Sequence, residues 1–501
     1  MASPRPAVRR LAAVTVTLLA ACLAAPIADG LTGPRVAHAA TNQLTLHAYD
    51  SAGQRLPWSA FRRLQENGKG AAGDNDTLVD PVTLQVVRMW PLASSGGAAG
   101  DPVIALPATR SSLAMAWPTS DGYSNLIIDL PATGGTYVFN LFAARQVVGD
   151  LDAAVAARPW YTPSADFSAA SATAHDRLAA AKVAAAESQR GALGAQALDA
   201  AVHAQTLLLS EAGTQYARSH RGSLPPAQWG VTFDDISGGS SALATVSQLV
   251  QGSSVDGWVR IVFDRSEPAG YYAAEVTGAH QAGLHVLGQI LDSSDMAAVS
   301  LSAWQTRVQS YVAALPSVDE WEIGNEVNGN WLGGSVAAKV AYAATYVKAH
   351  TSARTMLTLY WQLGEDNASD SMFTWAAANL AASTRAAVDD IGLSLYPEDH
   401  PMGAAFDRVM TTLHAAFPAQ RLLVTELGYW SADLGHTWWW GSQSAPTTTG
   451  RLAVARLYQT AGLGYSYAGG GGYWWYYLTE ALPTSTPLWG TLAALHSTVA
   501  N

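Results

Sequence analysis

Two glutamates each stand at the end of a short apolar run of the kind that forms a buried β-strand. Glu326 closes the segment Trp-Glu-Ile-Gly-Asn-Glu, and Glu426 closes the segment Leu-Val-Thr-Glu. A pair of carboxyl groups can share the work of a reaction when one stays protonated as a general acid and the other is ionised as a nucleophile. Both groups must then face the same substrate, so the fold has to bring two distant segments together.

The chain after Pro225-Pro226 alternates strand-like apolar runs with amphipathic or alanine-rich stretches. The strand candidates are Gly230 to Phe233, Trp258 to Phe263, His285 to Leu291, Glu320 to Ile323, Met356 to Trp361, Ile391 to Tyr396, Leu422 to Thr425 and Gly472 to Tyr477. The clearest helix candidates are Ala298 to Ala314, Val336 to Lys348, Met372 to Ala382, Ala404 to Phe417 and Arg451 to Ala461. Strand then helix, repeated eight times, predicts an α/β fold of the TIM (β/α)8 barrel type over residues 228–501. A doubly wound open sheet shows the same alternation, but no Gly-x-Gly-x-x-Gly phosphate loop follows the first strand.

The predicted barrel gives the two glutamates a common location. The carboxyl ends of barrel strands meet at one rim, and Glu326 ends the fourth strand while Glu426 ends the seventh. Cleavage of a glycosidic bond with retention of configuration requires two such carboxyl groups, about 5 to 5.5 Å apart. Glutamates at the ends of strands four and seven could meet this requirement, and such chemistry needs no cofactor. His400 and His436 lack the paired spacing of metal ligands, so we predict no metal site.

The order and positions of these motifs resemble clan A glycoside hydrolases, from Trp229 to about Thr498. In that clan an Asn-Glu pair closes strand four and a glutamate closes strand seven. The resemblance implies that Glu326 is the acid/base and Glu426 the nucleophile of a double-displacement reaction on β-linked polysaccharide or oligosaccharide. It also implies that Asn325 binds the sugar 2-hydroxyl.

Further positions match the clan. The Val-Arg-Ile run around Arg260 resembles that of strand two, and the resemblance implies that Arg260 pairs with the nucleophile and keeps it ionised. The Ser-Leu-Tyr-Pro run that contains Tyr396 resembles strand six of the endo-β-1,4-galactanase branch, whose tyrosine reaches the nucleophile. Strand eight of the clan supplies a tryptophan as the floor of the -1 subsite, and of Trp474 and Trp475 we choose Trp474. Ser394 stands where many members carry a histidine, so the family within the clan is not defined.

Two regions precede the barrel. Residues 41–150 carry short β-like runs separated by Gly, Pro, Asp and Ser, the last of them Tyr137 to Leu141, which predicts a β-sandwich-like accessory domain. Residues 160–222 are rich in Ala, Leu, Gln and Glu at helical spacing, which predicts a helical connector of two packed helices. This stretch resembles no family that we can name.

Residues 1–39 have the form of a signal peptide, with arginines before an apolar run and a cleavage site at Ala37-His38-Ala39. We therefore expect a secreted protein. A second interpretation is a lipobox, because Leu-Ala-Ala-Cys ends at Cys22, and cleavage before Cys22 would leave a lipid anchor at the cell surface. The apolar run in this segment is too short to span a membrane. Cys22 is the only cysteine, so the folded domains contain no disulfide.

The amino-acid composition limits the kinds of binding partner that we expect for this protein. The formal net charge is -11 and only 13% of the 501 residues are charged, so no basic surface is expected for nucleic acid or anionic lipid. The chain carries 18 tryptophans, whose rings can stack on the apolar faces of sugars or pack in the core. The expected partner is a β-linked glycan substrate.

Several assignments stay open at the level of sequence. Aspartates that follow strands fit both sugar binding and helix N-capping: Asp234, Asp235, Asp264 and Asp292. Tryptophans after strand seven fit both sugar platforms and loop packing: Trp430, Trp438, Trp439 and Trp440. A catalytically inactive carbohydrate-binding protein of the cell surface and a transglycosylase are alternative functions for the same motifs.

Overall fold

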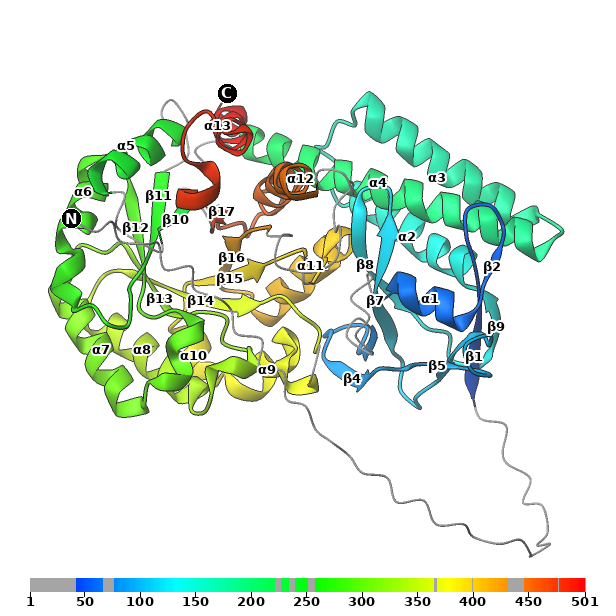
Figure 1. Ribbon diagram of the computed structural model, residues 1–501, viewed down its shortest axis with the longest axis horizontal. Coiled ribbons are helices and arrows are strands. Elements are labelled where there is room, and N and C mark those ends of the chain that lie inside the picture. Colours follow the sequence, from blue (N-terminus) through cyan, green and yellow to red (C-terminus); the bar gives the residue numbers. More distant parts are fainter. Residues whose placement is uncertain are drawn as a thin grey trace, which may run out of the picture. The chain divides into compact units, whose positions relative to one another are not determined.

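The barrel is formed by parallel strands that pair side by side around a closed ring (Figure 1). The computed structural model describes residues 42–65, 76–220, 227–233, 239–250, 257–364, 367–398, 400–429, 446–475 and 477–500. The ring runs in chain order through β10 Gln228–Phe233, β11 Gly257–Val262, β12 His285–Gln289, β13 Glu320–Gly324, β14 Arg354–Tyr360, β15 Asp390–Leu395, β16 Arg421–Leu427 and β17 Gly470–Trp474. This closed eight-stranded ring confirms the predicted TIM barrel.

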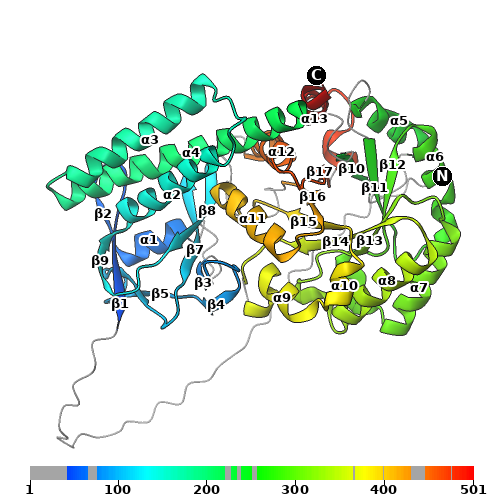
Figure 2. The same cartoon turned by 180° about the vertical axis from the view of Figure 1, so that it is seen from behind.

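Helices surround the ring, as the views from both sides show (Figures 1 and 2). They are α5 Gly239–Val250, α6 Ala273–Gln281, α7 Leu301–Ala314, α8 Val336–His350, α9 Met372–Asn379, α10 Ala382–Ala386, α11 Phe406–Ala416, α12 Pro446–Ala461 and α13 Pro487–Ala500. Successive side chains of a strand point to opposite faces. In β11, Val259 and Ile261 therefore join the large apolar cluster beneath the helices, whereas Trp258 and Arg260 point into the barrel lumen.

An apolar layer fills the barrel lumen beneath the carboxyl ends of the strands. It consists of Trp258, Leu287, Met356, Leu423 and Tyr473, which are contributed by alternate positions on five strands. The lumen is thus a packed core, and the layer above it supports the side chains at the carboxyl ends of the strands.

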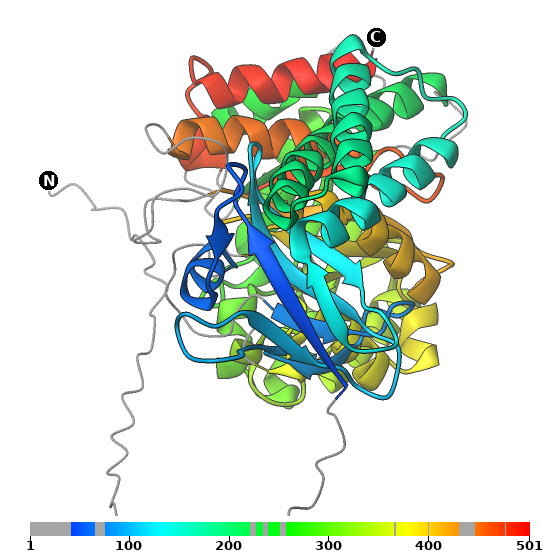
Figure 3. The ribbon, with the colours of Figure 1, turned by 90° about the vertical axis from the view of Figure 1, so that its right-hand side faces the viewer.

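The accessory region contains two antiparallel sheets, drawn in blue and cyan in Figure 3. Its elements are β1 Gln43–Tyr49, β2 Arg55–Leu56, α1 Trp58–Gln65, β3 Asp76–Val79, β4 Val86–Met89, β5 Leu92–Ser94, β6 Pro102–Ala105, β7 Ser112–Thr119, β8 Gly122–Asp129 and β9 Gly135–Val138. One sheet has the order β2-β1-β6-β5, with β9 pairing in parallel to β1, and the other has the order β4-β3-β7-β8. Leu44 and Ile104 of the first sheet share one apolar cluster with Leu113 and Met115 of the second. The shared cluster agrees with the predicted sandwich-like packing.

Helix α2 Phe139–Ala156 follows these sheets. The predicted connector then contains two helices, as expected: α3 Ala165–Val183 and α4 Glu187–Ser219. The strand expected from Tyr137 to Leu141 is wrong beyond Val138, because the helix α2 begins at Phe139. A short apolar run does not separate a strand from a buried helix by its pattern alone, which explains the error. Helices α3 and α4 lie side by side (Figures 1 and 2).

Strand β7 is buried on both faces from Ser112 to Trp117. Leu113 and Met115 belong to the accessory cluster, whereas Ala114 and Ala116 belong to the cluster that contains the barrel helices. Ion pairs add to this contact, with Arg408 of α11 bonded to Asp129 and Arg158 bonded to Asp407. The accessory sheet therefore packs directly on the barrel.

Some predictions fall on residues outside the described part of the chain. These are the signal peptide 1–39 with Cys22, the aspartates Asp234 and Asp235, and the loop tryptophans Trp430, Trp438, Trp439 and Trp440. Among the described helices, none combines the length and the apolar character that a membrane crossing requires.

Candidate active site

Both glutamates lie where a strand departs from regular geometry. The pairing of β13 with β14 shifts register between Glu322 and Gly324, and Glu326 has a φ of 50°. The pairing of β15 with β16 shifts between Leu393 and Ser394, so that Ser394 aligns with Glu426. A left-handed backbone at a residue with a side chain costs on the order of 1–3 kcal/mol and is typical of functional sites. These irregularities let neighbouring side chains face the lumen together, which regular alternation forbids.

Glu426 lies among three of the predicted site residues. The hydroxyl of Tyr396 donates to its Oε1 at 2.5 Å, and Nη2 of Arg260 donates to its Oε2 at 2.8 Å. Nδ2 of Asn325 also donates to Oε2, at 3.1 Å. Three donors around one carboxylate stabilise its ionised form.

The guanidinium of Arg260 is divided between two carboxylates. It makes two hydrogen bonds to Glu322, from Nε at 2.7 Å and from Nη2 at 3.1 Å, besides the bond to Glu426. Thr358 also donates to Glu322, at 2.6 Å. Burial acts to lower the pKa of Arg260, but the charges of both glutamates raise it, so the guanidinium stays charged. Sequence reasoning missed Glu322, although its two-residue spacing from Glu320 places both on one face of β13.

Two serines that the sequence analysis did not single out form hydrogen bonds with Glu326, the predicted acid/base. Ser293 Oγ lies 2.7 Å from its Oε2, and Ser394 Oγ lies 2.6 Å from its Oε1. Ser394 occupies the strand-six position where the resembled clan often has histidine, which is the one signal the sequence offered. The backbone N–H of Ser293 donates to Asn325 Oδ1 at 3.0 Å, which links the end of β12 to the end of β13.

The two carboxyl groups have raised pKa values that differ from one another. Burial, followed by the charge of Glu426, raises the pKa of Glu326 to about 8. Burial raises the pKa of Glu426 to about 7, although the charge of Arg260 acts to lower it. The charge of Arg260 and the hydrogen bond from Tyr396 favour the ionised form of Glu426, whereas the lowering partners of Glu326 are neutral serines, so Glu426 loses its proton first as pH rises. An acid that remains protonated beside a carboxylate that is ionised is the arrangement that acid-assisted nucleophilic displacement needs.

Asp292 belongs to the same rim, just before Ser293. Its Oδ1 accepts hydrogen bonds from the backbone N–H and the hydroxyl of Ser294, so it caps the 3-10 helix η3 Ser293–Ala298. Its negative charge also acts to raise the pKa of both Glu326 and Glu426. Capping and influence on the site therefore coexist in this aspartate.

The tryptophan that lies beside the site is Trp475, which directly follows β17, and not the predicted Trp474. The ring of Trp474 is 0% exposed, and its Nε1 donates to Glu480 at 2.9 Å. The guanidinium carbon of Arg260 lies 5.0 Å from the centre of the Trp475 ring, within the range of a cation–π contact. Tyr473 shares the lumen side with Trp475 through the two-residue alternation of the strand, which leaves Trp474 facing the helices. A fully buried outward-facing ring has no surface to offer a sugar.

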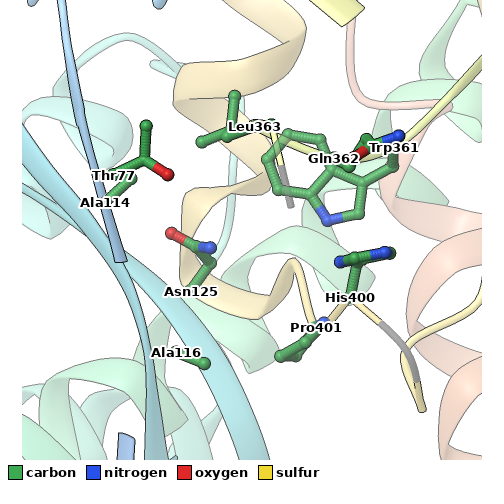
Figure 4. Close-up of a pocket in the computed structure, with 10 residues that line it drawn as sticks. Thr77, Ala114, Ala116, Asn125, Trp361, Gln362, Leu363, His400 and Pro401 are labelled. Atoms are coloured by element: carbon green, nitrogen blue, oxygen red, sulfur yellow. The ribbon is translucent and has the colours of Figure 1, made fainter. Parts of the chain in front are cut away.

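A separate small cavity lies between the accessory sheet and the segments that follow β14 and β15 (Figure 4). Asn125 and Thr77 line it on one side, and Trp361 and His400 line it on the other. Its volume of about 30 Å³ has room for one or two waters but not for a sugar ring. His400 is thus part of a domain contact, and the described residues contain no cluster of metal-ligating side chains.

Comparisons with known proteins identify no family for this chain. No family model matches the chain, and no curated protein matches it. Among solved structures, a GH113 β-mannanase from Alicyclobacillus acidocaldarius is 15% identical, covering 54% of this chain and 97% of its own, with a TM-score of 0.37. A fungal β-1,4-galactanase is 14% identical over 56% and 96%, with a TM-score of 0.36. An endo-1,4-β-xylanase from Penicillium canescens is 12% identical over 56% and 96%, with a TM-score of 0.38. At such identities and scores these likenesses carry no argument about activity.

Proposed function

We propose that this chain is a retaining glycoside hydrolase that cleaves β-glycosidic bonds in polysaccharides or oligosaccharides. The observation that carries the proposal is the hydrogen-bonded path between the two carboxyl groups. Glu426 accepts from Asn325, Asn325 accepts from the backbone of Ser293, and the hydroxyl of Ser293 bonds to Glu326. Two buried carboxyl groups joined by so short a path support a double displacement, which requires two such groups about 5 to 5.5 Å apart.

In the proposed reaction the ionised Glu426 attacks the anomeric carbon of the sugar. The bond from that carbon to the glycosidic oxygen breaks as the new carbon–oxygen bond forms, and Glu326 gives its proton to the departing oxygen. Glu326, now ionised, then removes a proton from water, which attacks the glycosyl-enzyme and releases Glu426. Two inversions leave the anomeric configuration unchanged, and the chemistry draws on no group beyond these residues and water.

The surrounding residues have supporting roles in this proposal. Arg260 and Tyr396 hold Glu426 in its ionised, oriented form through the bonds at 2.8 and 2.5 Å. Asn325 is placed to bind the sugar 2-hydroxyl, because its amide lies beside the nucleophile. We assign the floor of the -1 subsite to Trp475 instead of Trp474, since Trp475 lies over Arg260.

The pKa values define the expected pH dependence. The acid must be protonated, so activity falls as pH rises through the pKa of Glu326, about 8. The nucleophile must be ionised, so activity falls as pH drops through the pKa of Glu426, about 7. We expect a narrow bell-shaped profile of kcat/KM between these limits.

The deciding experiment is a substrate screen followed by assignment of the two roles. Purified protein is tested against β-glucans, β-mannans, xylans, galactans and aryl β-glycosides. On the substrate found, Glu326→Ala and Glu426→Ala are each assayed with added azide. Azide should yield a β-glycosyl azide with Glu326→Ala, by attack on the glycosyl-enzyme, and an α-glycosyl azide with Glu426→Ala, by direct attack. Near wild-type hydrolysis by either variant would rule out the assignment.

The same screen separates the alternatives. Saccharide binding by the wild-type protein without hydrolysis or transfer would identify a non-catalytic binding protein. Transfer of the glycosyl group to a second sugar, seen as longer products in mass spectra, would identify a transglycosylase. We further propose that the protein acts outside the cell after removal of residues 1–39. The N-terminal residue of the protein recovered from its host tests this, because a lipidated Cys22 would be found instead if the lipobox is used.

A further inference from the structure

Trp331 connects the surface of the site to the acid/base. It belongs to the short 3-10 helix η4 Asn330–Leu332, and its ring is 38% exposed. Nε1 of this ring donates to Ser293 Oγ at 3.1 Å, and the same Oγ lies 2.7 Å from Glu326 Oε2. An exposed aromatic ring is therefore two hydrogen bonds away from the candidate catalytic acid.

The orientation of this ring is fixed by its neighbours. The ring of Tyr360 meets it edge to face, with centroids 5.4 Å apart and an interplanar angle of 87°. Gly329 lies against the ring, since a Cβ at that position would come within 2.5 Å of the indole. The absence of a side chain at Gly329 thus allows the indole to reach Ser293.

The direction of the hydrogen bonds follows from which groups can donate. An indole N–H only donates, so Ser293 Oγ must accept from Trp331. The single hydroxyl proton of Ser293 is then directed to Oε2 of Glu326, the other partner within reach. If Oε2 carried the acid proton, two hydrogens would meet on that contact and the hydroxyl proton of buried Ser293 would lose its acceptor.

Oε1 of Glu326 has a different environment. Its partner is Ser394, whose hydroxyl lies 2.6 Å away. A proton on Oε1 would turn the hydroxyl proton of buried Ser394 away from this oxygen, just as a proton on Oε2 would for Ser293. What Trp331 adds is direction: its N–H fixes Ser293 as a donor, and a donor stabilises the ionised form of Glu326.

We propose that Trp331 is the platform for the leaving-group sugar and that, through Ser293, it stabilises the ionised form of Glu326 that remains after proton transfer. This inference rests on the proposed hydrolase function. The proton of Glu326 goes to the leaving oxygen, so the leaving-group sugar must lie beside Glu326, where Trp331 presents an exposed ring. Apolar faces of sugars stack on such rings. The ligand class is a saccharide unit on the reducing side of the cleaved bond.

The effect of Trp331 on the ionisation of Glu326 is tested without turnover. Trp331→Phe keeps an aromatic ring but removes the N–H, so Ser293 becomes a weaker donor to Glu326. The pKa of Glu326, followed by carbon-13 NMR of protein labelled at glutamate carboxyls and identified with Glu326→Gln, is expected to move upward. An unchanged titration in Trp331→Phe would overturn this part of the proposal.

The platform is tested with two substrates of the sugar that the screen identifies. With its oligosaccharide, Trp331→Ala should lower kcat/KM about tenfold through lost stacking. With the corresponding β-glycosyl fluoride, which has no leaving-group ring and needs little acid assistance, the same variant should lose much less. Equal losses on both substrates would overturn the platform.

A pair of glycine variants tests the position of the ring itself. Gly329→Ala should displace the indole and reproduce the substrate selectivity of Trp331→Ala, because the three atoms nearest to its new Cβ all belong to the Trp331 ring. Gly334→Ala, in the same loop, meets nothing within 4 Å and serves as the control. Wild-type protein that hydrolyses none of the screened glycosides would instead overturn the proposed function, and the subsite with it. Hydrolysis that is insensitive to Trp331→Ala and Gly329→Ala would overturn the subsite alone.

Discussion

The barrel lumen holds a buried group of charged side chains at each end, and the two groups are balanced differently. At the amino-terminal end, Glu320 and Asp390 face two arginines. Arg354 and Arg421 both bond to Asp390, at distances from 2.7 to 2.9 Å. Burial acts to raise the pKa of Asp390, but the bonds from Arg421 and Glu320 outweigh it and lower the pKa. Burial and the charge of Asp390 raise the pKa of Glu320. The two arginines at this end therefore balance or exceed the charge of the carboxylates.

The carboxyl end of the lumen is short of positive charge. Glu322, Glu326 and Glu426 are all buried there, and among the described residues the cation bonded to this group is Arg260. Here burial prevails and the pKa values of Glu326 and Glu426 rise to about 8 and about 7. One barrel therefore contains two kinds of buried charged group. The carboxyl groups at the amino-terminal end are paired with arginines, whereas those at the carboxyl end outnumber the cation bonded to them and have pKa values near neutral pH. Such a trade of stability for function is expected at active sites.

The largest expected effect separates the two groups by stability. Asp390→Ala leaves two arginines without their shared partner and should lower the free energy of unfolding by about 3 kcal/mol, the lower range for a broken buried pair because Arg354 reaches solvent. Glu426→Gln removes a buried charge that burial disfavours, so above pH 7 it should leave stability unchanged or higher while abolishing turnover. Urea denaturation of both variants at pH 8 measures this. Equal destabilisation by the two variants would remove the distinction between the groups.

The next effect concerns the shared arginine. A lysine in place of Arg260 has one ammonium group and cannot bond Glu322 and Glu426 as the planar guanidinium does. The pKa of Glu426 should rise further, so the acidic limb of the kcat/KM profile should move upward past pH 7. If the pKa of Glu426 rises above that of Glu326, the productive protonation state becomes rare. The maximal rate should fall about a hundredfold once the pKa of Glu426 lies two units above that of Glu326. An acidic limb that stays in place in Arg260→Lys would show that Arg260 does not govern the nucleophile.

A smaller effect is expected from the tyrosine. Tyr396→Phe removes the 2.5 Å hydrogen bond to Glu426 Oε1 and keeps the ring. A hydrogen bond to a charged group contributes about 1.5 kcal/mol at the low end, so the acidic limb should rise by about one pH unit. Tyr342→Phe, which removes a hydroxyl bonded to Gln309 on the helical surface, is the matched control. A shift of equal size in both variants would point to a general structural effect.

The fold was largely predictable because a barrel strand is buried on both faces and reads as a continuous apolar run. All eight strands lie where the runs predicted, with ends that differ by a few residues. The N-terminal helix α2 was missed because Tyr137 to Leu141 reads equally well as a strand. Helical spacing becomes decisive only over longer windows.

The site was predictable as far as it follows strand ends. Arg260, Asn325 and Tyr396 do gather around Glu426. Ser293 was not predictable because it lies beyond the end of β12, where strand alternation no longer applies. The choice of Trp475 was not predictable because the pairing of β17 with β10 shifts register. A one-residue shift reverses the face of every later side chain, and sequence alone does not reveal it.

The smallest expected effect sharpens the comparison by removing charge from the rim alone. Asp292→Asn keeps an oxygen that can cap η3 but removes a negative charge that acts to raise the pKa of both glutamates. Both pKa values should fall, so the acidic and alkaline limbs of kcat/KM should move together to lower pH, by a few tenths of a unit at low salt and less at high salt. Asp295→Asn, which removes the same charge from the same turn, is the control, since Asp295 is paired with Arg265. Movement of a single limb would contradict a common electrostatic origin, because a charge that acts on both carboxyl groups has to displace both titrations in the same direction.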